Sequence, residues 1–321
     1  MGVDNYKPKT KDELKKAVDE ILENTESTHI DLNVIDTSAV TDMRGLFKRY
    51  QLNSMHVLDM NGWDVSKVTD MSEMFYDTEF TALISKWDVG GVRYMNGMFE
   101  NSHLEMDISE WNVSGVTEME TMFKYSDFKG DISKWNVSNV ENMKEMFYGS
   151  EFNGDISKWD VSKVEDMSGM FCSCEFTGDI SGWDVSGVKR MAYTFFGTKK
   201  TDGLSEWDVS NVENMREMFG ESDFNGDISK WDVSKVKDMR EMFAESGFNS
   251  YIGGWNVSKV TDMCSMFWNT KYDKDLSKWN VSDKCDVEDM FANVEGMTDE
   301  LKPEACRYVD MDIDINLDEL Y

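Results

Sequence analysis

The chain has 321 residues, of which 63 are acidic and 33 are basic, so its formal net charge is −30 at pH 7. This charge argues against a protein that binds nucleic acid or an anionic membrane surface, because both kinds of binding need clustered Lys and Arg side chains. Hydrophobic residues make up 40% of the chain, which excludes a disordered acidic tract.

The N-terminal segment predicts a helix that closes one end of the fold. Thr10 and Glu13 have the spacing of a capping box, in which two side chains satisfy free amides of the first helical turn. Apolar residues then recur on one helical face from Leu14 to Leu22. We therefore expect a helix over residues 10–24 and assign residues 1–30 to an N-terminal helical cap.

Neither a signal peptide nor a membrane-spanning segment is visible in the sequence. As written, the chain is expected to be cytoplasmic and not inserted into a membrane. If an upstream signal was removed, a surface or secreted location is expected instead. The five cysteines are odd in number and irregularly spaced, which predicts no disulfide framework.

A tryptophan at every 24th residue dominates the rest of the sequence. The segment FNGDISKWDVSKV occurs at 152–164 and again at 224–236, which is a separation of three such periods. A period of this length is typical of a solenoid, in which each coil packs only on its neighbours. The tryptophans of the period are Trp63, Trp87, Trp111, Trp135, Trp159, Trp183, Trp207, Trp231, Trp255 and Trp279.

A degenerate coil precedes the first of these tryptophans, with Ile35 in the place of Trp and an insertion within 48–58. We therefore assign residues 31–291 to a repeat solenoid of about eleven coils.

One repeat mixes two periodicities. Apolar and polar residues alternate at 159–162, which predicts a short strand. Apolar residues from Val164 to Phe171 have the spacing of one helical face, and Ser162 with Glu165 forms a capping box before them. Gly178 predicts a tight return turn. The repeat therefore predicts an α/β solenoid with a parallel sheet on one side and short helical turns on the other.

The C-terminal segment predicts a strand. Residues 309–317, VDMDIDINL, alternate between apolar and polar side chains, which gives a strand one apolar and one charged face. We assign residues 292–321 to a C-terminal strand cap.

The repeat phrase W-[DN]-V-S-x-V-x-x-M-x-x-M-F, followed by F-x-G-D-I-S, resembles the BspA-type leucine-rich-repeat surface proteins. It is more similar to the family long described as a domain of unknown function in mycoplasma lipoproteins. The resemblance covers about residues 31–291 and implies a leucine-rich-repeat-like solenoid of 24-residue coils, with Ile156, Trp159 and Val161 matching L-x-x-L-x-L. Members of the family are often secreted or surface-anchored and suspected of adhesion.

Aspartates recur at two positions of the coil. Asp or Asn follows each tryptophan, and Lys often precedes it. Together these side chains predict a solvated outer face of the sheet. The alternative is that they form a flat polar binding surface. A second set follows the turn glycine: Asp107, Asp131, Asp155, Asp179, Asp227 and Asp275. Stacked carboxylates are candidate calcium ligands, but we favour backbone amides of the same turn as their partners. We predict no metal site and no cofactor.

No constellation of residues indicates catalysis. The histidines His29, His56 and His103 have no motif that links them to a nucleophile or a metal, and the C-x-C of Cys172 and Cys174 has no second pair. Phosphate-binding glycine motifs are also absent from the sequence. The chain is therefore expected not to be an enzyme.

Departures from the repeat supply the candidate partner contacts. Aromatic and lysine side chains break the pattern in YTFFGTKKTDG at 193–203 and again three coils later. Exposed aromatics beside lysine are typical contact anchors, although the pattern favours the competing interpretation of local repacking in an imperfect coil. The candidates are Tyr193, Phe196, Lys199, Lys200, Trp268 and Tyr272.

The leading functional hypothesis is a non-enzymatic protein–protein recognition scaffold of the leucine-rich-repeat type, with a protein partner that the sequence does not identify. The main alternative is an acidic surface mimic that binds basic proteins, which the net charge motivates. A third hypothesis is a fragment of a surface adhesin without its export signal.

Overall fold

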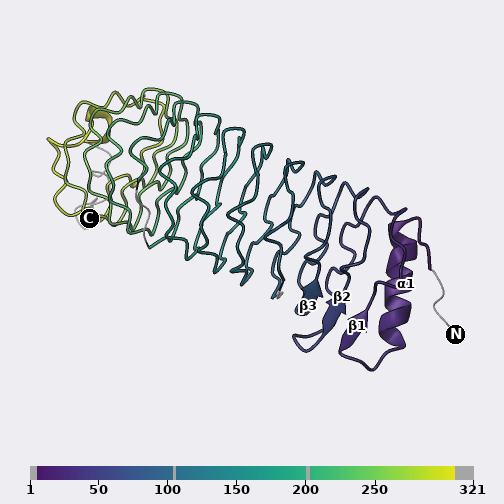
Figure 1. Cartoon of the computed structure of the whole chain (residues 1–321). Helices are drawn as coiled ribbons and strands as arrows, with labels where there is room; N and C mark the ends of the chain where they lie inside the picture. Colours follow the sequence, from purple (N-terminus) through teal and green to yellow (C-terminus); the bar gives the residue numbers. More distant parts are fainter. Residues whose placement is uncertain (1–5, 104–105, 200–202, 308–321) are drawn as a thin grey trace, which may run out of the picture.

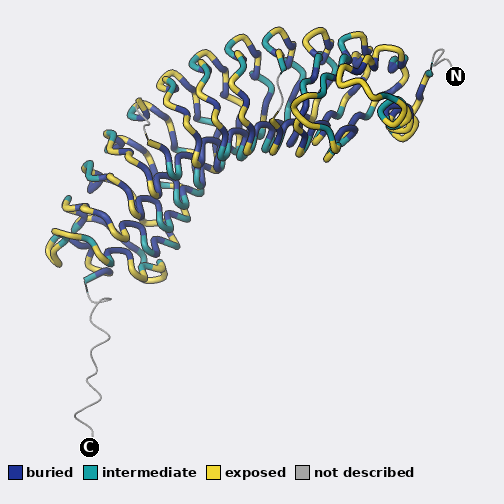
Figure 2. Tube along the Cα trace, turned by 90° about the horizontal axis from the view of Figure 1, so that it is seen from below, coloured by how far each residue is buried: buried dark blue, intermediate teal, exposed yellow. Residues whose placement is uncertain are grey.

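The computed structural model describes residues 6–103, 106–199 and 203–307. These residues wind into a curved array of stacked coils with helix α1 at one end (Figures 1 and 2). The elements in chain order are α1 (Lys11–Glu23), β1 (His29–Asp31), β2 (Val57–Asp59), β3 (Thr81–Leu83) and the 3-10 helix η1 (Glu304–Cys306). No helix in the described ranges has the length and apolar character needed to cross a membrane.

Helix α1 forms where the sequence predicted a helix and covers the first coil. The Thr10 hydroxyl oxygen accepts a hydrogen bond from the Glu13 amide at 3.3 Å, and the Glu13 carboxylate accepts one from the Lys9 amide at 2.7 Å. Both bonds satisfy free amides at the helix start. Leu14, Ala17 and Val18 are buried in the common core, so the apolar face of α1 packs against the array.

Two columns of aromatic rings run through the core. One phenylalanine per coil, from Phe47 to Phe291, stacks on the next with ring centroids 5.4–6.0 Å apart. Each tryptophan from Trp63 to Trp279 donates its indole N–H to a backbone carbonyl of the preceding coil at 2.7–3.2 Å. Buried indoles need such a partner, and the 24-residue period supplies one in every coil.

The Met–Met–Phe segment of each coil is a ladder of turns. The amides of residues 167, 169, 171 and 173 donate to carbonyls of the next coil at 2.7–3.1 Å, whereas the amides of 170, 172 and 174 donate three residues back. Parallel bridges connect equivalent residues of successive coils from Asp42 to Asp286. We call the residues equivalent to 165–173 in every coil the turn face.

The prediction of a capped helical turn in this segment was wrong. Alternate amides leave the coil for its neighbour, so a helical ladder of bonds four residues back cannot form. The predicted capping box is absent too: Ser162 donates its amide and hydroxyl to Asp160 at 3.1 and 2.6 Å, and Glu165 pairs with Lys189. The spacing of the apolar residues is the same in a turn ladder, which explains the error.

The strand predicted at tryptophan was also wrong. Residues 159–161 form no strand and connect two turns, which are closed by bonds from the Trp159 amide to Ile156 and from the Val164 amide to Val161. The strands of the structure lie earlier in the first coils, in a parallel sheet of order β1-β2-β3 that pairs Ile30 with Leu58 and Leu58 with Ala82. The strand predicted at residues 309–317 lies outside the described residues.

The array bends toward the turn face. Neighbouring rings are 5.4–6.0 Å apart in the phenylalanine column, which belongs to the turn face, and 6.1–6.5 Å apart where tryptophans stack. Coils that are closer on one side must curve toward it. Figure 2 accordingly shows closely spaced segments along the inner edge of the arc and wider loops along the outer edge.

Aspartates close the turns away from the turn face. The carboxylates that follow tryptophan, such as Asp160 and Asp232, and those that precede isoleucine, such as Asp155 and Asp227, accept the amide two residues ahead at 2.9–3.1 Å. Hydrogen bonds from the hydroxyl and amide of the following serine hold the pKa of these carboxyls below its usual value. The interpretation that the second aspartate set bonds amides of its own turn is confirmed.

Two residues of every turn face have a left-handed backbone. The positions equivalent to 169 and 173 have φ between +50° and +65° in each coil from Gly45 to Asn293, and 17 of them are not glycine. The left-handed region costs a residue with a Cβ roughly 1–2 kcal/mol. Glycine at these positions should therefore stabilise the fold.

The exposed Glu221, with φ +53°, provides the test of this expectation. We predict that Glu221→Gly raises the free energy of unfolding by about 1 kcal/mol, whereas Glu221→Ala does not raise it, because alanine keeps the Cβ. Denaturant titration of the three proteins measures the difference. Equal stabilities of the Gly and Ala variants would contradict the left-handed assignment.

The aspartate turns predict the response to acid. Because the folded-state pKa of these carboxyls is lowered, their contribution to stability is complete above the unfolded-state pKa of about 4 and is lost as pH falls below it. Asn112, Asn136 and Asn256 make the same turns without titrating. The triple variant Asp160→Asn, Asp208→Asn, Asp232→Asn should therefore lose less Tm between pH 5 and pH 3 than the parent chain. An unchanged Tm profile would exclude these turns as acid-sensitive elements.

Candidate functional site

Exposed aromatic side chains gather on the turn face. Tyr125 is 48% exposed and Trp268 is 37% exposed, whereas Tyr148, Tyr193 and Phe196 are half-buried. All five stand at the positions equivalent to 169, 172 and 173 of their coils. The concave side of the array therefore exposes aromatic ring surface.

A shallow groove crosses the middle of the turn face and joins four coils. Three tyrosines and five charged residues line it, together with small residues that leave the space open. The tyrosines are Tyr125, Tyr148 and Tyr193, the charged residues are Lys124, Lys144, Glu145, Asp166 and Arg190, and the small residues are Ser168, Gly169 and Ala192. We call these residues the central groove.

Lysine and glutamate pair at one end of the central groove. Glu145 bonds Lys124 and lies 4.0 Å from the Lys144 ammonium. The Lys124 ammonium also lies over the rings of Tyr148 and Tyr125, at 4.7 and 5.5 Å from their centroids. Burial alone would lower the pKa of Lys124, but the bond to Glu145 outweighs it and the pKa is raised. This end of the groove is a fixed, internally neutralised network.

Arg190 stands at the other end and is held by one contact. Its Nε donates to Asp166 Oδ2 at 2.7 Å, and Asp166 Oδ1 accepts the Ser168 amide at 2.9 Å. Asp166 is 14% exposed and Arg190 53% exposed at the side chain. Within the described ranges, the structure shows no other hydrogen bond from the Arg190 side chain. The terminal guanidinium N–H groups are thus oriented beside the groove and available to a ligand.

Two of the turn-face rings pack directly against glycine residues, and two of the tyrosines have a left-handed backbone. A Cβ at Gly149 would lie 2.6 Å from the Tyr125 ring, and a Cβ at Gly220 would lie 3.0 Å from the Phe196 ring. Tyr125 and Tyr193 also have φ of +54° and +59°, which is uncommon for bulky residues. The same φ recurs at two positions of every coil, so it belongs to the turn ladder and does not by itself mark the groove.

Three of the six contacts predicted from the sequence lie on the turn face. Tyr193 lines the central groove, and Phe196 lies beside it with ring centroids 6.1 Å apart. Trp268 occupies the position of Phe196 three coils further along the array and is exposed. The structure therefore brings Tyr193 and Phe196 together and separates Trp268 from them.

The other three predicted contacts do not join this surface. Tyr272 was wrongly predicted to be exposed: it is fully buried and stacks on Phe248 and Phe267, because it takes the place of phenylalanine in a third column of stacked rings. Lys199 is exposed but does not line the central groove. Lys200 lies outside the described residues.

Sequence reasoning missed Tyr125, Lys124 and Arg190. Each stands at a turn-face position that carries varied residues in other coils, and their proximity follows only from the stacking of successive coils. One signal was available: the stretch from Lys189 to Gly197 contains no acidic residue, unlike the equivalent stretches of the neighbouring coils.

A second hollow lies near the N-terminal third of the array. His103, Asp127 and Lys129 line it, together with the buried rings of Phe80 and Phe128. It borders residues 104–105, which are outside the described ranges. Its lining mixes polar and apolar side chains, including the partly buried Met106, and its two aromatic rings are buried, so we do not assign it a ligand.

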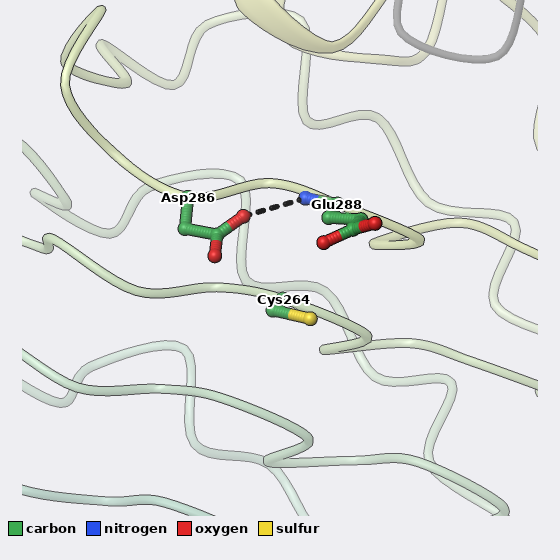
Figure 3. Close-up of side chains that lie close together, drawn as sticks. All are labelled: Cys264, Asp286 and Glu288. Atoms are coloured by element: carbon green, nitrogen blue, oxygen red, sulfur yellow. Dashed lines mark hydrogen bonds between the residues drawn. The ribbon is translucent and has the colours of Figure 1, made fainter.

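One group of side chains has the composition of a metal site (Figure 3). Ligand atoms of Cys264, Asp286 and Glu288 lie within 4.8 Å of one another. Asp286 already accepts the Glu288 amide at 3.0 Å, and burial raises the pKa of the Cys264 thiol, which disfavours the thiolate that metals bind. Exposed acidic groups are frequent in a chain of charge −30, so the group is explained without a metal.

The comparisons with known proteins identify one family. The model of a family described as Mycoplasma protein of unknown function, DUF285, matches the chain over residues 16–124, 49–150, 101–203 and 195–303. These overlapping matches follow the tandem repeats and span most of the chain. No curated protein and no solved structure matches it.

The corrected position of Tyr272 gives a prediction about stability. Its hydroxyl is buried without a well-formed hydrogen bond, so Tyr272→Phe should change the free energy of unfolding by less than about 1 kcal/mol. Tyr272→Ala should lower it by about 3–5 kcal/mol, because it leaves a cavity in the aromatic column. Denaturant titration measures both values, and a small effect of Tyr272→Ala would contradict the core position.

Proposed function

The chain belongs to this family, and we propose that it is a non-enzymatic protein–protein recognition scaffold of the leucine-rich-repeat type. In this proposal a partner protein binds along the concave turn face, with the central groove as the main contact. The observation that carries the proposal is the groove itself: three tyrosines and Arg190 line one depression on the concave side.

The residue types on the turn face support a protein partner. Tyr, Trp and Arg dominate the energetics of protein interfaces. Six of the seven arginines of the chain stand on the turn face: Arg44, Arg49, Arg93, Arg190, Arg216 and Arg240. Lysines, in contrast, occur all around the coil. Arginine concentrated on one face is what an interface needs, because its guanidinium combines planar stacking with directed hydrogen bonds.

The geometry of the array also suits a scaffold. Each coil contacts its neighbours through backbone bonds that do not depend on the turn-face side chains. Those side chains can therefore differ from coil to coil without loss of the fold. A curved face of this kind presents a long concave surface, which is how solenoids bind proteins.

A second candidate function is an acidic surface that binds basic proteins. The net charge of −30 favours it, and the aspartates that follow tryptophan place many carboxylates away from the turn face. Binding of this kind would be screened by salt, because the Debye length falls from about 10 Å at 0.1 M to about 3 Å at 1 M. The proposal of a surface adhesin shares the groove but requires the partner to be extracellular.

Affinity capture from lysate of the source cell and from extracellular matrix, at 0.1 M and 1 M salt, tests the scaffold. We predict one partner that survives high salt and is lost with the double variant Tyr125→Gly, Tyr193→Gly. Both substitutions relieve a positive φ, which offsets part of the loss of ring contacts, and the Tm of the variant shows that its fold is intact. The matched control is Glu221→Gly, which relieves the same backbone outside the groove and should retain the partner.

Each outcome of the capture experiment separates the candidates. A set of basic proteins that disappears at 1 M salt would support the acidic surface and contradict the scaffold. A partner from matrix alone would support adhesion. Retention of a salt-resistant partner by the double variant, with its fold intact, would remove the central groove from the proposal.

A further inference from the structure

We propose that the central groove recognises a carboxylate adjacent to an aromatic side chain in an extended segment of the partner protein. The proposal rests on the proposed function and names the chemistry that the groove selects. Arg190 would bind the carboxylate, and the rings of Tyr148 and Tyr193 would contact the aromatic side chain.

Asp166 and Ser168 restrain the Arg190 side chain at the edge of the groove. Asp166 holds the guanidinium through Nε, and the Ser168 amide holds Asp166 in turn. This contact restrains the guanidinium through Nε and does not use its terminal N–H groups. A guanidinium restrained in this way matches the two oxygens of a carboxylate and forms charge-assisted hydrogen bonds with little loss of side-chain entropy.

The other arginines of the turn face lie outside the groove, although Arg49, Arg216 and Arg240 also contact a carboxylate through Nε. Arg44 donates hydrogen bonds from Nε and from one terminal guanidinium nitrogen to the Asp42 carboxylate, at 2.7–3.1 Å. The side of its guanidinium that would bind a carboxylate is therefore already occupied. Arg240 pairs with Glu241, and its coil also carries Asp238 on the turn face. Only the coil of Arg190, among those around the groove, has no acidic residue on its turn face.

The local charge around the groove also favours a carboxylate. Lys124 is paired with Glu145, Lys144 with Glu120 and Arg190 with Asp166, so the groove and its ion-pair partners are locally neutral on a strongly acidic molecule. A single carboxylate therefore meets less repulsion here than on the acidic parts of the surface. A phosphate dianion would meet repulsion from both Glu145 and Asp166, and a nucleic acid would meet it from the whole chain.

Aromatic surface lies beside Arg190 in the groove. Tyr148 is in edge contact with Tyr125 at 5.2 Å between centroids, and Tyr193 donates its hydroxyl to Glu217 at 2.7 Å, so both rings are held in place. Ser168, Gly169 and Ala192 leave the space between them open. A partner ring placed there would bury apolar surface and stack at an offset, which adds to the energy of burial.

The experiment uses 3-phenylpropionate as the probe, with uncharged 3-phenylpropionamide as its matched analogue. Saturation-transfer and titration NMR on the full chain measure the dissociation constant of each. We predict that the carboxylate binds about tenfold more tightly than the amide. Arg190→Gln should abolish the difference, whereas Arg240→Gln, an arginine with a similar pair outside the groove, should preserve it. The Tm of both variants shows that the fold is intact.

Three results would overturn the inference: equal binding of the two probes, an unchanged preference in Arg190→Gln, or tighter binding of phenyl phosphate than of 3-phenylpropionate. Failure here and failure of the proposed function are distinguishable. A salt-resistant partner that Arg190→Gln still captures would keep the scaffold and reject this chemistry. Probe binding as predicted, without any captured protein, would keep the carboxylate subsite and reject the protein scaffold.

Discussion

Every other feature of the structure depends on the hydrogen bonds that pass from each coil to the next along the turn face. Because alternate amides donate to the following coil, equivalent residues must lie directly above one another, and the 24-residue period is the condition for that register. The aromatic columns and the indole bonds repeat the same register inside the core. No single coil can satisfy its amides alone, so a coil is stable only when it stacks on its neighbours, as expected for a solenoid.

The same bonds determine where the surface can vary. They require a left-handed backbone at two positions of each coil, and most of those positions carry a residue other than glycine. The chain tolerates the free-energy cost of a left-handed backbone at many positions. Stability alone therefore does not determine which residue types occur there. Tyr125 and Tyr193 are the bulkiest of them, and both line the central groove. In the proposed function, these two partner contacts therefore stand at positions with a left-handed backbone.

Much of the architecture followed from the sequence, because its signals were local and repeated. The helix at Lys11–Glu23, the stacked coils and the aspartates bonded within their own turns were all predicted. The turn ladder was not, since the apolar spacing from Val164 to Phe171 fits a helix equally well and only inter-coil bonds decide between them. Tyr272 was misplaced for a related reason: an irregular residue in the sequence can be a regular member of a column in space. Tyr193 and Phe196 were found as departures from the pattern, but their proximity to Tyr125, Tyr148 and Arg190 required the stacking of coils.

The proposed function requires that a partner contacts the concave groove, and site-specific photo-crosslinking measures such contact. A benzophenone amino acid would replace Tyr148, in the central groove, or Tyr251, which is 50% exposed and lies outside the turn face. After irradiation of the full chain in lysate and in matrix, the account predicts a discrete crosslinked partner from position 148 and none from position 251. Crosslinking from position 251 with none from position 148 would contradict the account.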